Sequence, residues 1–266
     1  ASHNIGEAMT FVVTAFVVGA LGWQAGFLSA AGMGLLGVII IFLLLKPFQV
    51  AGEENMTTAE KQKNIGKKQL EVLKTPIIWV LALSSAFMYI ARYAINSWGI
   101  FYFEAEKGYS VEQAALMISI SSIFGIIGTV GSGLVSDKLF NGDRTLMAFL
   151  TSAMNLLSLV LFLFVPAGYY WVDVLSMVLF GLSIGVLICF LGGLMAVDIA
   201  PAEAAGATAG VVGLASYAAA GLQDIVSGYL IEGRKVMVDG VAHYDFSAIR
   251  FFWIAAALAS LLLLVY

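Results

Sequence analysis

The chain has 266 residues, of which 61% are hydrophobic and only 11% are charged. Soluble domains carry about 25% charged residues, so this composition excludes an ordinary soluble protein and indicates one embedded in lipid. The net charge of −4 is small and predicts no nucleic-acid-binding surface. With one cysteine, two distant histidines and no phosphate-binding loop, we expect no disulfide within the chain, no metal centre and no cofactor.

Eight segments are apolar and long enough to be membrane-spanning helices. About 20 residues are needed, since a helix rises roughly 1.5 Å per residue across a hydrocarbon core of about 30 Å. The expected spans are 3–21, 26–45, 76–103, 112–134, 145–165, 171–195, 206–231 and 249–266. The sequence therefore predicts an all-α, polytopic membrane protein with eight transmembrane helices.

A long polar segment, residues 46–75, separates the second span from the third and is rich in lysine and glutamate. It predicts a soluble linker, and Pro76 stands where the first turn of a helix tolerates proline. Alternation of the spans puts Lys138 and Arg144 on the side of the linker. Because basic residues are in excess on that side, we expect it to be cytoplasmic.

Residues 235–244 lie on the opposite side and alternate around Asp239-Gly240. This pattern predicts a small hairpin with a type I′ turn. A disordered loop is an equal alternative, because an isolated two-stranded hairpin is only marginally stable in water.

One arginine lies deep inside an expected span. Arg92 is about sixteen positions into its helix, hence roughly 24 Å from the helix start. A cation there costs at least about 2.5 to 3.5 kcal/mol, so it must face a watery cavity or an anion. Tyr89 and Asn96 share its polar stripe at helical spacing. Because a guanidinium matches phosphate or carboxylate oxygens with paired donors, the stripe favours an anionic cargo.

Two residues of the span 206–231, Tyr217 and Asp224, join the candidate site. Asp224 is the one acid well inside that span, so a structural ion pair between Arg92 and Asp224 is the alternative to a cargo site. Both arrangements can hold, with the cargo competing for the arginine.

The first span begins with His3 and Glu7, one helical turn apart. A histidine can donate to a phosphate and titrates near neutral pH. Glu7 would repel an anion unless it is protonated or directed at hydroxyl groups. The alternative for both residues is structural hydrogen bonding at the membrane interface. No catalytic constellation is present, so we do not expect an enzyme.

Residues 133–138, Gly-Leu-Val-Ser-Asp-Lys, are followed by Arg144 in the next short loop. This pattern resembles the signature of the major facilitator superfamily. The resemblance implies a conformational latch made by Gly133, Asp137, Lys138 and Arg144 through cytoplasmic ion pairs. It also implies that residues 1–45 are the last two helices of an N-terminal bundle, 46–75 an inter-domain linker and 76–266 a C-terminal six-helix bundle.

Three further stretches resemble the organophosphate:phosphate antiporters, which include hexose-6-phosphate and glycerol-3-phosphate transporters. They are residues 2–6 (Ser-His-Asn-Ile-Gly), 92–98 (Arg-Tyr-Ala-Ile-Asn-Ser-Trp) and 200–206 (Ala-Pro-Ala-Glu-Ala-Ala-Gly). The resemblance implies that His3, with Asn4 beside it, and Arg92 bind the phosphate moiety. It further implies exchange of a phosphate ester for inorganic phosphate, by alternating access, in a bacterial cytoplasmic membrane.

Some positions depart from this family pattern. Ser97 and Ser122 stand where the glycerol-phosphate branch carries acids, and Glu7 replaces a glycine, which favours hexose phosphate as cargo. A membrane sensor for hexose phosphate and a glycerol-3-phosphate antiporter are the alternatives. On this template the chain supplies helices five to twelve. We therefore expect it to work with the first four helices of the same protein, which carry an opposing arginine.

Overall fold

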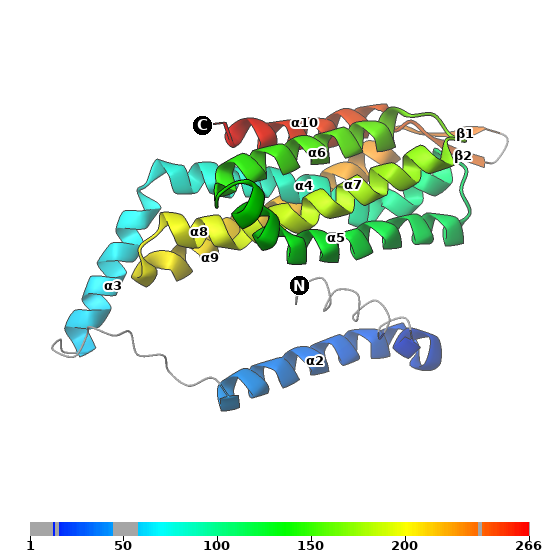
Figure 1. The fold of residues 1–266 in the computed structure, drawn as a ribbon. Coiled ribbons are helices and arrows are strands. Elements are labelled where there is room, and N and C mark those ends of the chain that lie inside the picture. The colour runs from blue at the N-terminus through cyan, green and yellow to red at the C-terminus, as the bar shows by residue number, and fades with distance from the viewer. Residues whose placement is uncertain (1–12, 14–15, 45–57, 239–240, 266) are drawn as a thin grey trace. The chain divides into compact units, whose positions relative to one another are not determined.

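The computed structural model describes residues 13, 16–44, 58–238 and 241–265 (Figure 1). The chain divides into two compact units, Ala1–Gln62 and Lys63–Tyr266. Almost all of the described residues are helical.

The described part of the first unit contains one long helix, α2 (Trp23–Leu44). Its 22 residues are apolar on every side, and Gly26 is its single buried residue. A helix with an apolar surface all round is typical of a membrane span. The expected span 26–45 is thus a helix that begins three residues earlier, directly after Gly22, whose positive φ of 87° interrupts the preceding helical residues.

The expected linker contains a helix that the sequence analysis did not predict, α3 (Thr58–Leu73). Two residues later the chain enters α4 (Pro76–Ala105), with proline in the first turn as expected. The indole Nε1 of Trp79 donates to the carbonyl oxygen of Leu73 at 2.8 Å. Val72 packs with Ile78, so the end of α3 is attached to the start of α4.

The second unit is a bundle built from α4 and the helices that follow it. These are α5 (Val111–Leu139), α6 (Arg144–Phe164), α7 (Tyr170–Cys189), α8 (Met195–Ile199), α9 (Ala205–Glu232) and α10 (Ser247–Leu263). A π-helix, Phe190–Leu194, joins α7 to α8, so that both form one continuous span, and a 3₁₀ turn, Ala202–Ala204, precedes α9.

Within the described residues, six helices are long and apolar enough to cross a membrane. The count of eight expected spans is therefore not reproduced there. Most of the expected span 3–21 lies outside the described residues, and α10 has 17 residues where 18 were expected over 249–266. Hydropathy shows that this last segment is apolar, but it does not show at which residue the helix ends. The prediction of a polytopic helical membrane protein is confirmed.

Side chains fix several helix starts in the bundle. Ser110 and Gln113 form a capping box at the start of α5, each side chain bonding the backbone N–H of the other residue. Asp143 accepts a hydrogen bond from the N–H of Leu146 at the start of α6. These caps satisfy backbone donors that a helix leaves unpaired.

The backbones of the helices α5 and α7 lie in direct contact. A Cβ atom added to Gly185 would lie 2.2 Å from the carbonyl oxygen of Gly125, and one added to Gly181 would lie 2.1 Å from that of Ser121. Thr129 adds a hydrogen bond across this contact, from its Oγ1 to the carbonyl oxygen of Gly185 at 3.0 Å. Small residues are what allow membrane helices to approach so closely.

Between α9 and α10 the chain forms the hairpin β1 (Lys235–Val238) and β2 (Val241–Tyr244). The strands are antiparallel, with Lys235 opposite Tyr244 and Val238 opposite Val241. The ring of Tyr244 lies 5.0 Å from that of Phe101, so the hairpin packs against the end of α4. The segment is thus the expected hairpin and not the alternative loop (Figure 1), while its turn, residues 239–240, lies outside the described residues.

Candidate functional site

Arg92 lies in the middle of α4 and its side chain is buried, with 3% of the residue exposed. Its Cζ atom is 5.6 Å from the ring centre of Tyr89 and 5.4 Å from that of Tyr93. The negative faces of aromatic rings attract a guanidinium. The charge predicted to lie deep in the span is thus held inside the bundle by two tyrosines of its own helix.

The helix α9 runs beside α4 in the same direction. The hydroxyl oxygens of Ser85 and Ser216 are 2.8 Å apart, and the rings of Tyr89 and Tyr217 meet edge to face at 5.4 Å. This arrangement brings together Arg92, Tyr89 and Tyr217, three of the residues that the sequence analysis selected from two distant segments.

Polar groups at this site are also accessible. Asn96, one turn beyond Arg92, is exposed, and Tyr217 retains 55% of its surface. The site therefore has a buried cation flanked by side chains that a ligand can reach.

Asp224 is partly buried on α9 and does not form an ion pair with Arg92. Its Oδ1 atom is buried, and no donor reaches it among the residues that the structure describes. A buried carboxylate oxygen is costly without a hydrogen-bond donor. The sequence-based alternative of a permanent Arg92–Asp224 ion pair is thus not observed.

His3, Asn4 and Glu7 lie outside the described residues. Their approach to Arg92 stays a prediction.

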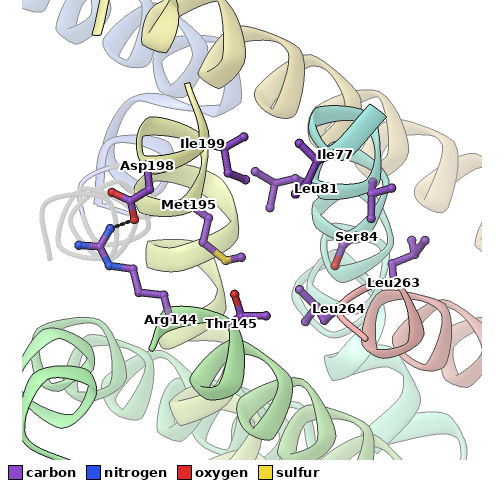
Figure 2. A pocket seen from close by; sticks show the side chains of 11 residues that line it. Ile77, Leu81, Ser84, Arg144, Thr145, Met195, Asp198, Ile199, Leu263 and Leu264 are labelled. Atoms are coloured by element: carbon purple, nitrogen blue, oxygen red, sulfur yellow. Dashed lines mark hydrogen bonds and ion pairs between the residues drawn. The ribbon is translucent and has the colours of Figure 1, made fainter. Parts of the chain in front are cut away.

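Of the expected latch, Gly133, Asp137 and Lys138 are exposed near the end of α5. In the described ranges, neither Asp137 nor Lys138 forms an ion pair. Arg144, the first residue of α6, pairs with Asp198 on α8 (Figure 2). Sequence reasoning missed Asp198, although it is an acid that follows the expected span 171–195 on the same membrane side as Arg144.

A buried ion pair at the opposite end of the bundle was also missed. Lys107, between α4 and α5, donates to the carboxylate of Asp173 in the first turn of α7, and Tyr109 donates to the second oxygen at 2.8 Å. Burial lowers the pKa of Lys107, an effect that Asp173 opposes. Burial and the neighbouring Asp173 both raise the pKa of Tyr109. Nearby, Arg250 of α10 pairs with Glu106.

The family described as Major Facilitator Superfamily matches residues 1–223. The membrane sensor protein UhpC of Escherichia coli is 31% identical over 83% of this chain and 53% of its own length. A probable hexose phosphate transport protein of Chlamydia trachomatis is 30% identical over 98% of this chain and 60% of its own length. The glycerol-3-phosphate transporter of Bacillus subtilis is 28% identical over 81% of this chain and 52% of its own length.

The chain thus spans between about half and three fifths of the length of these relatives. Among solved structures, it is similar to a bacterial homologue of the human lysosomal transporter Spinster, crystallised in an inward-facing and unoccupied conformation. The TM-score is 0.52 at 17% identity, over 98% of this chain and 62% of the other. This likeness shows the fold alone.

Proposed function

Because this chain belongs to the Major Facilitator Superfamily and, within it, to the organophosphate:phosphate antiporter family, we propose that its protein exchanges hexose 6-phosphate for inorganic phosphate. The chain is an integral multi-pass membrane protein, and its relatives place it in a bacterial cytoplasmic membrane. The bundle α4 to α10 is assigned to the C-terminal half of the transporter, and α2 to the N-terminal half.

The observation that carries this proposal is the burial of Arg92 in the middle of α4. A cation in a membrane helix is retained at a cost, and such residues mark substrate pathways. A phosphate group accepts two parallel hydrogen bonds from a guanidinium, which is among the strongest pairings available in proteins. The rings of Tyr89 and Tyr93 hold the charge in place, so the donors are oriented before the anion arrives.

The sugar part of the cargo would contact the groups around Arg92. Asn96 and Tyr217 are exposed beside it, and the buried Oδ1 of Asp224 can accept a hydrogen bond from a sugar hydroxyl. A ligand hydroxyl there would satisfy an oxygen that burial otherwise leaves costly. A substrate that carries hydroxyl groups, such as a hexose phosphate, can supply this donor.

The mechanism is alternating access, in which two bundles rock about a midplane site. Arg92 from this half, His3 and an arginine from the first four helices would hold the phosphate between them. When the site is empty, their like charges resist closure of the two halves. Binding of a phosphate removes that repulsion, so the carrier crosses only when loaded, and outward phosphate flow drives sugar phosphate inward.

A sensor for hexose phosphate is the second candidate. It is favoured by the similarity to proteins named membrane sensor protein UhpC from Escherichia coli and Salmonella typhimurium, at 31% and 30% identity. A sensor would use the same phosphate site to bind its ligand but would show little flux.

The two candidates are separated by flux measurements on the natural full-length protein in proteoliposomes loaded with labelled phosphate. For an antiporter, external glucose 6-phosphate releases the label, and Arg92→Ala reduces the exchange rate at least about 30-fold, since truncating one partner of a buried charge pair costs about 2 kcal/mol or more. Leu83→Ala, at an exposed position of the same helix, is the control and should keep the exchange rate. Exchange that survives Arg92→Ala contradicts the phosphate site, and ligand binding without flux favours the sensor.

A further inference from the structure

A cavity lies away from Arg92, at the end of the bundle where α4 begins and α10 ends (Figure 2). Its volume is about 330 Å³, within the range of ligand pockets. Most of its wall is apolar and includes the side chains of Ile77, Leu81, Met195, Ile199, Leu263 and Leu264. They come from α4, α8 and the end of α10, and residues at the start of α6 complete the lining, so four helices of one bundle border the cavity.

One part of the rim is charged. Arg144 and Asp198 line the cavity and form an ion pair with each other, with 35% and 50% of their side chains exposed. In Figure 2 this pair lies on one side of the cavity, and Leu81, Leu263 and Leu264 lie across from it. The site is therefore amphiphilic: an apolar chamber with one accessible ion pair at its edge.

The position of the cavity indicates which molecules reach it. The first two turns of the membrane-spanning α4 form one wall, so the cavity lies where a span meets the membrane surface. The distribution of lysine and arginine predicts that this surface is cytoplasmic, where the leaflet carries anionic lipids. A phospholipid has both parts that the cavity would recognise, an acyl chain for the apolar wall and a phosphate for the guanidinium.

We propose that an acidic phospholipid of this leaflet binds in the cavity, with its phosphate on Arg144 and part of an acyl chain between Leu81 and Met195. In this structure the guanidinium of Arg144 is already paired with the carboxylate of Asp198. A lipid phosphate bound to the same guanidinium would lie close to that carboxylate, and the two negative charges repel each other. The lipid phosphate therefore displaces Asp198 from Arg144.

Displacement of Asp198 has a structural consequence. Asp198 belongs to α8, which is only five residues long and is followed by Pro201. On its other side the π-helix Phe190–Leu194 includes Gly192 and Gly193, and neither glycine has a neighbour within 4 Å of its Cβ position. Such π-helical turns occur where helices bend at functional sites. The bound lipid therefore releases α8 from α6.

Binding to the delipidated full-length protein in detergent tests this proposal by native mass spectrometry. The probes are a short-chain phosphatidylglycerol, a phosphatidylcholine with the same chains, and inorganic phosphate. We expect the phosphatidylglycerol to bind at least about tenfold more tightly than the phosphatidylcholine, and inorganic phosphate not to displace it. Equal binding of the two lipids, or displacement by phosphate alone, overturns the proposal.

Variants locate the lipid in this cavity. Leu81→Trp fills the chamber, and Leu83→Trp is its control, because Leu83 lies on the same helix with an exposed side chain outside the cavity. Leu81→Trp should weaken phosphatidylglycerol binding at least tenfold, and Leu83→Trp should leave it unchanged. Wild-type affinity in Leu81→Trp overturns the site.

The ion pair supplies a second pair of variants in case the tryptophan prevents folding. Arg144→Gln should weaken phosphatidylglycerol binding about tenfold or more, whereas Asp198→Asn should tighten it several-fold, since the competing carboxylate is neutralised. Changes in the same direction contradict displacement of Asp198. Because the readout is lipid binding and not flux, a failure here is distinguishable from a failure of the proposed transport activity.

Discussion

Lys107 donates a hydrogen bond to Asp173, 66 positions later in the chain, and both side chains are buried, with 2% and 0% exposed. The pair attaches the loop between α4 and α5 to the first turn of α7. A carboxylate there is also favoured by the N-terminal end of the helix dipole. Tyr109 satisfies the second carboxylate oxygen, so the buried charges are neutralised and hydrogen-bonded together.

Removing one partner of this pair is expected to destabilise the bundle. Lys107→Met leaves the carboxylate of Asp173 buried without its cation, which costs about 3 to 5 kcal/mol, whereas replacing both partners by apolar residues is often near neutral. The free energy of unfolding in detergent should therefore fall in Lys107→Met and recover largely in Lys107→Met/Asp173→Leu. Lys235→Met breaks an exposed ion pair with Glu232 and is the control. Equal effects of Lys107→Met and Lys235→Met would contradict the prediction.

The close contact of α5 and α7 predicts a position-specific effect of adding a methyl group. Gly185→Ala would place its Cβ against the carbonyl oxygen of Gly125, so we expect a loss of about 1 to 3 kcal/mol from overpacking. Gly131→Ala, in open space on α5, should be neutral or stabilising by up to about 1 kcal/mol, because alanine favours a helix. Unfolding of both variants in the same detergent compares them. Equal stability of the two variants would refute the contact.

The ring contact between Tyr89 and Tyr217 predicts that Tyr217 helps to position Tyr89 beside Arg92. Tyr217→Ala removes an edge-to-face contact worth about 0.5 to 1.5 kcal/mol, which should weaken the apparent substrate affinity about 2- to 13-fold. Tyr217→Phe keeps the ring and should retain most of that affinity. Tyr229→Ala, at an exposed tyrosine of the same helix, is the matched control. The half-saturating glucose 6-phosphate concentration for phosphate exchange is the measurement, and an unchanged value in Tyr217→Ala would speak against the role.

Asp245 predicts an acid-dependent contribution to stability at the base of the hairpin. Its carboxylate accepts hydrogen bonds from the N–H and hydroxyl of Ser247 and from Arg234, which lower its pKa from 3.8 to about 2. A depressed carboxyl pKa stabilises the fold above 3.8, and this contribution disappears as the pH falls toward 2.

The comparison of the wild type with Asp245→Asn checks this dependence. The difference in unfolding temperature should be constant above about pH 5 and should shrink between pH 4 and 2. A difference that is independent of pH over this interval would show that the carboxylate charge does not matter. The change should be small, because the side chain is exposed.

The positions of most spans could be predicted from hydropathy. The span expected at residues 76–103 corresponds to α4 (Pro76–Ala105). The span expected at residues 171–195 continues through the π-helix to Ile199. The helix α3 could not be recognised in this way, because a charged segment without an apolar run resembles a flexible linker. The identity of Asp198 as the partner of Arg144 was equally hidden, since 54 residues separate them.

The amino-acid sequence by itself determined that this is a helical membrane protein with a cation deep in one span. A bilayer offers no water to the backbone, so long apolar segments must be helices, and counting along a helix gives the depth of Arg92. Only the tertiary structure decided which side chains meet: Tyr217 with Tyr89, Asp198 with Arg144 and Asp173 with Lys107. These contacts depend on which helix faces pack together, and packing is set by the shapes of whole surfaces, such as the glycines between α5 and α7.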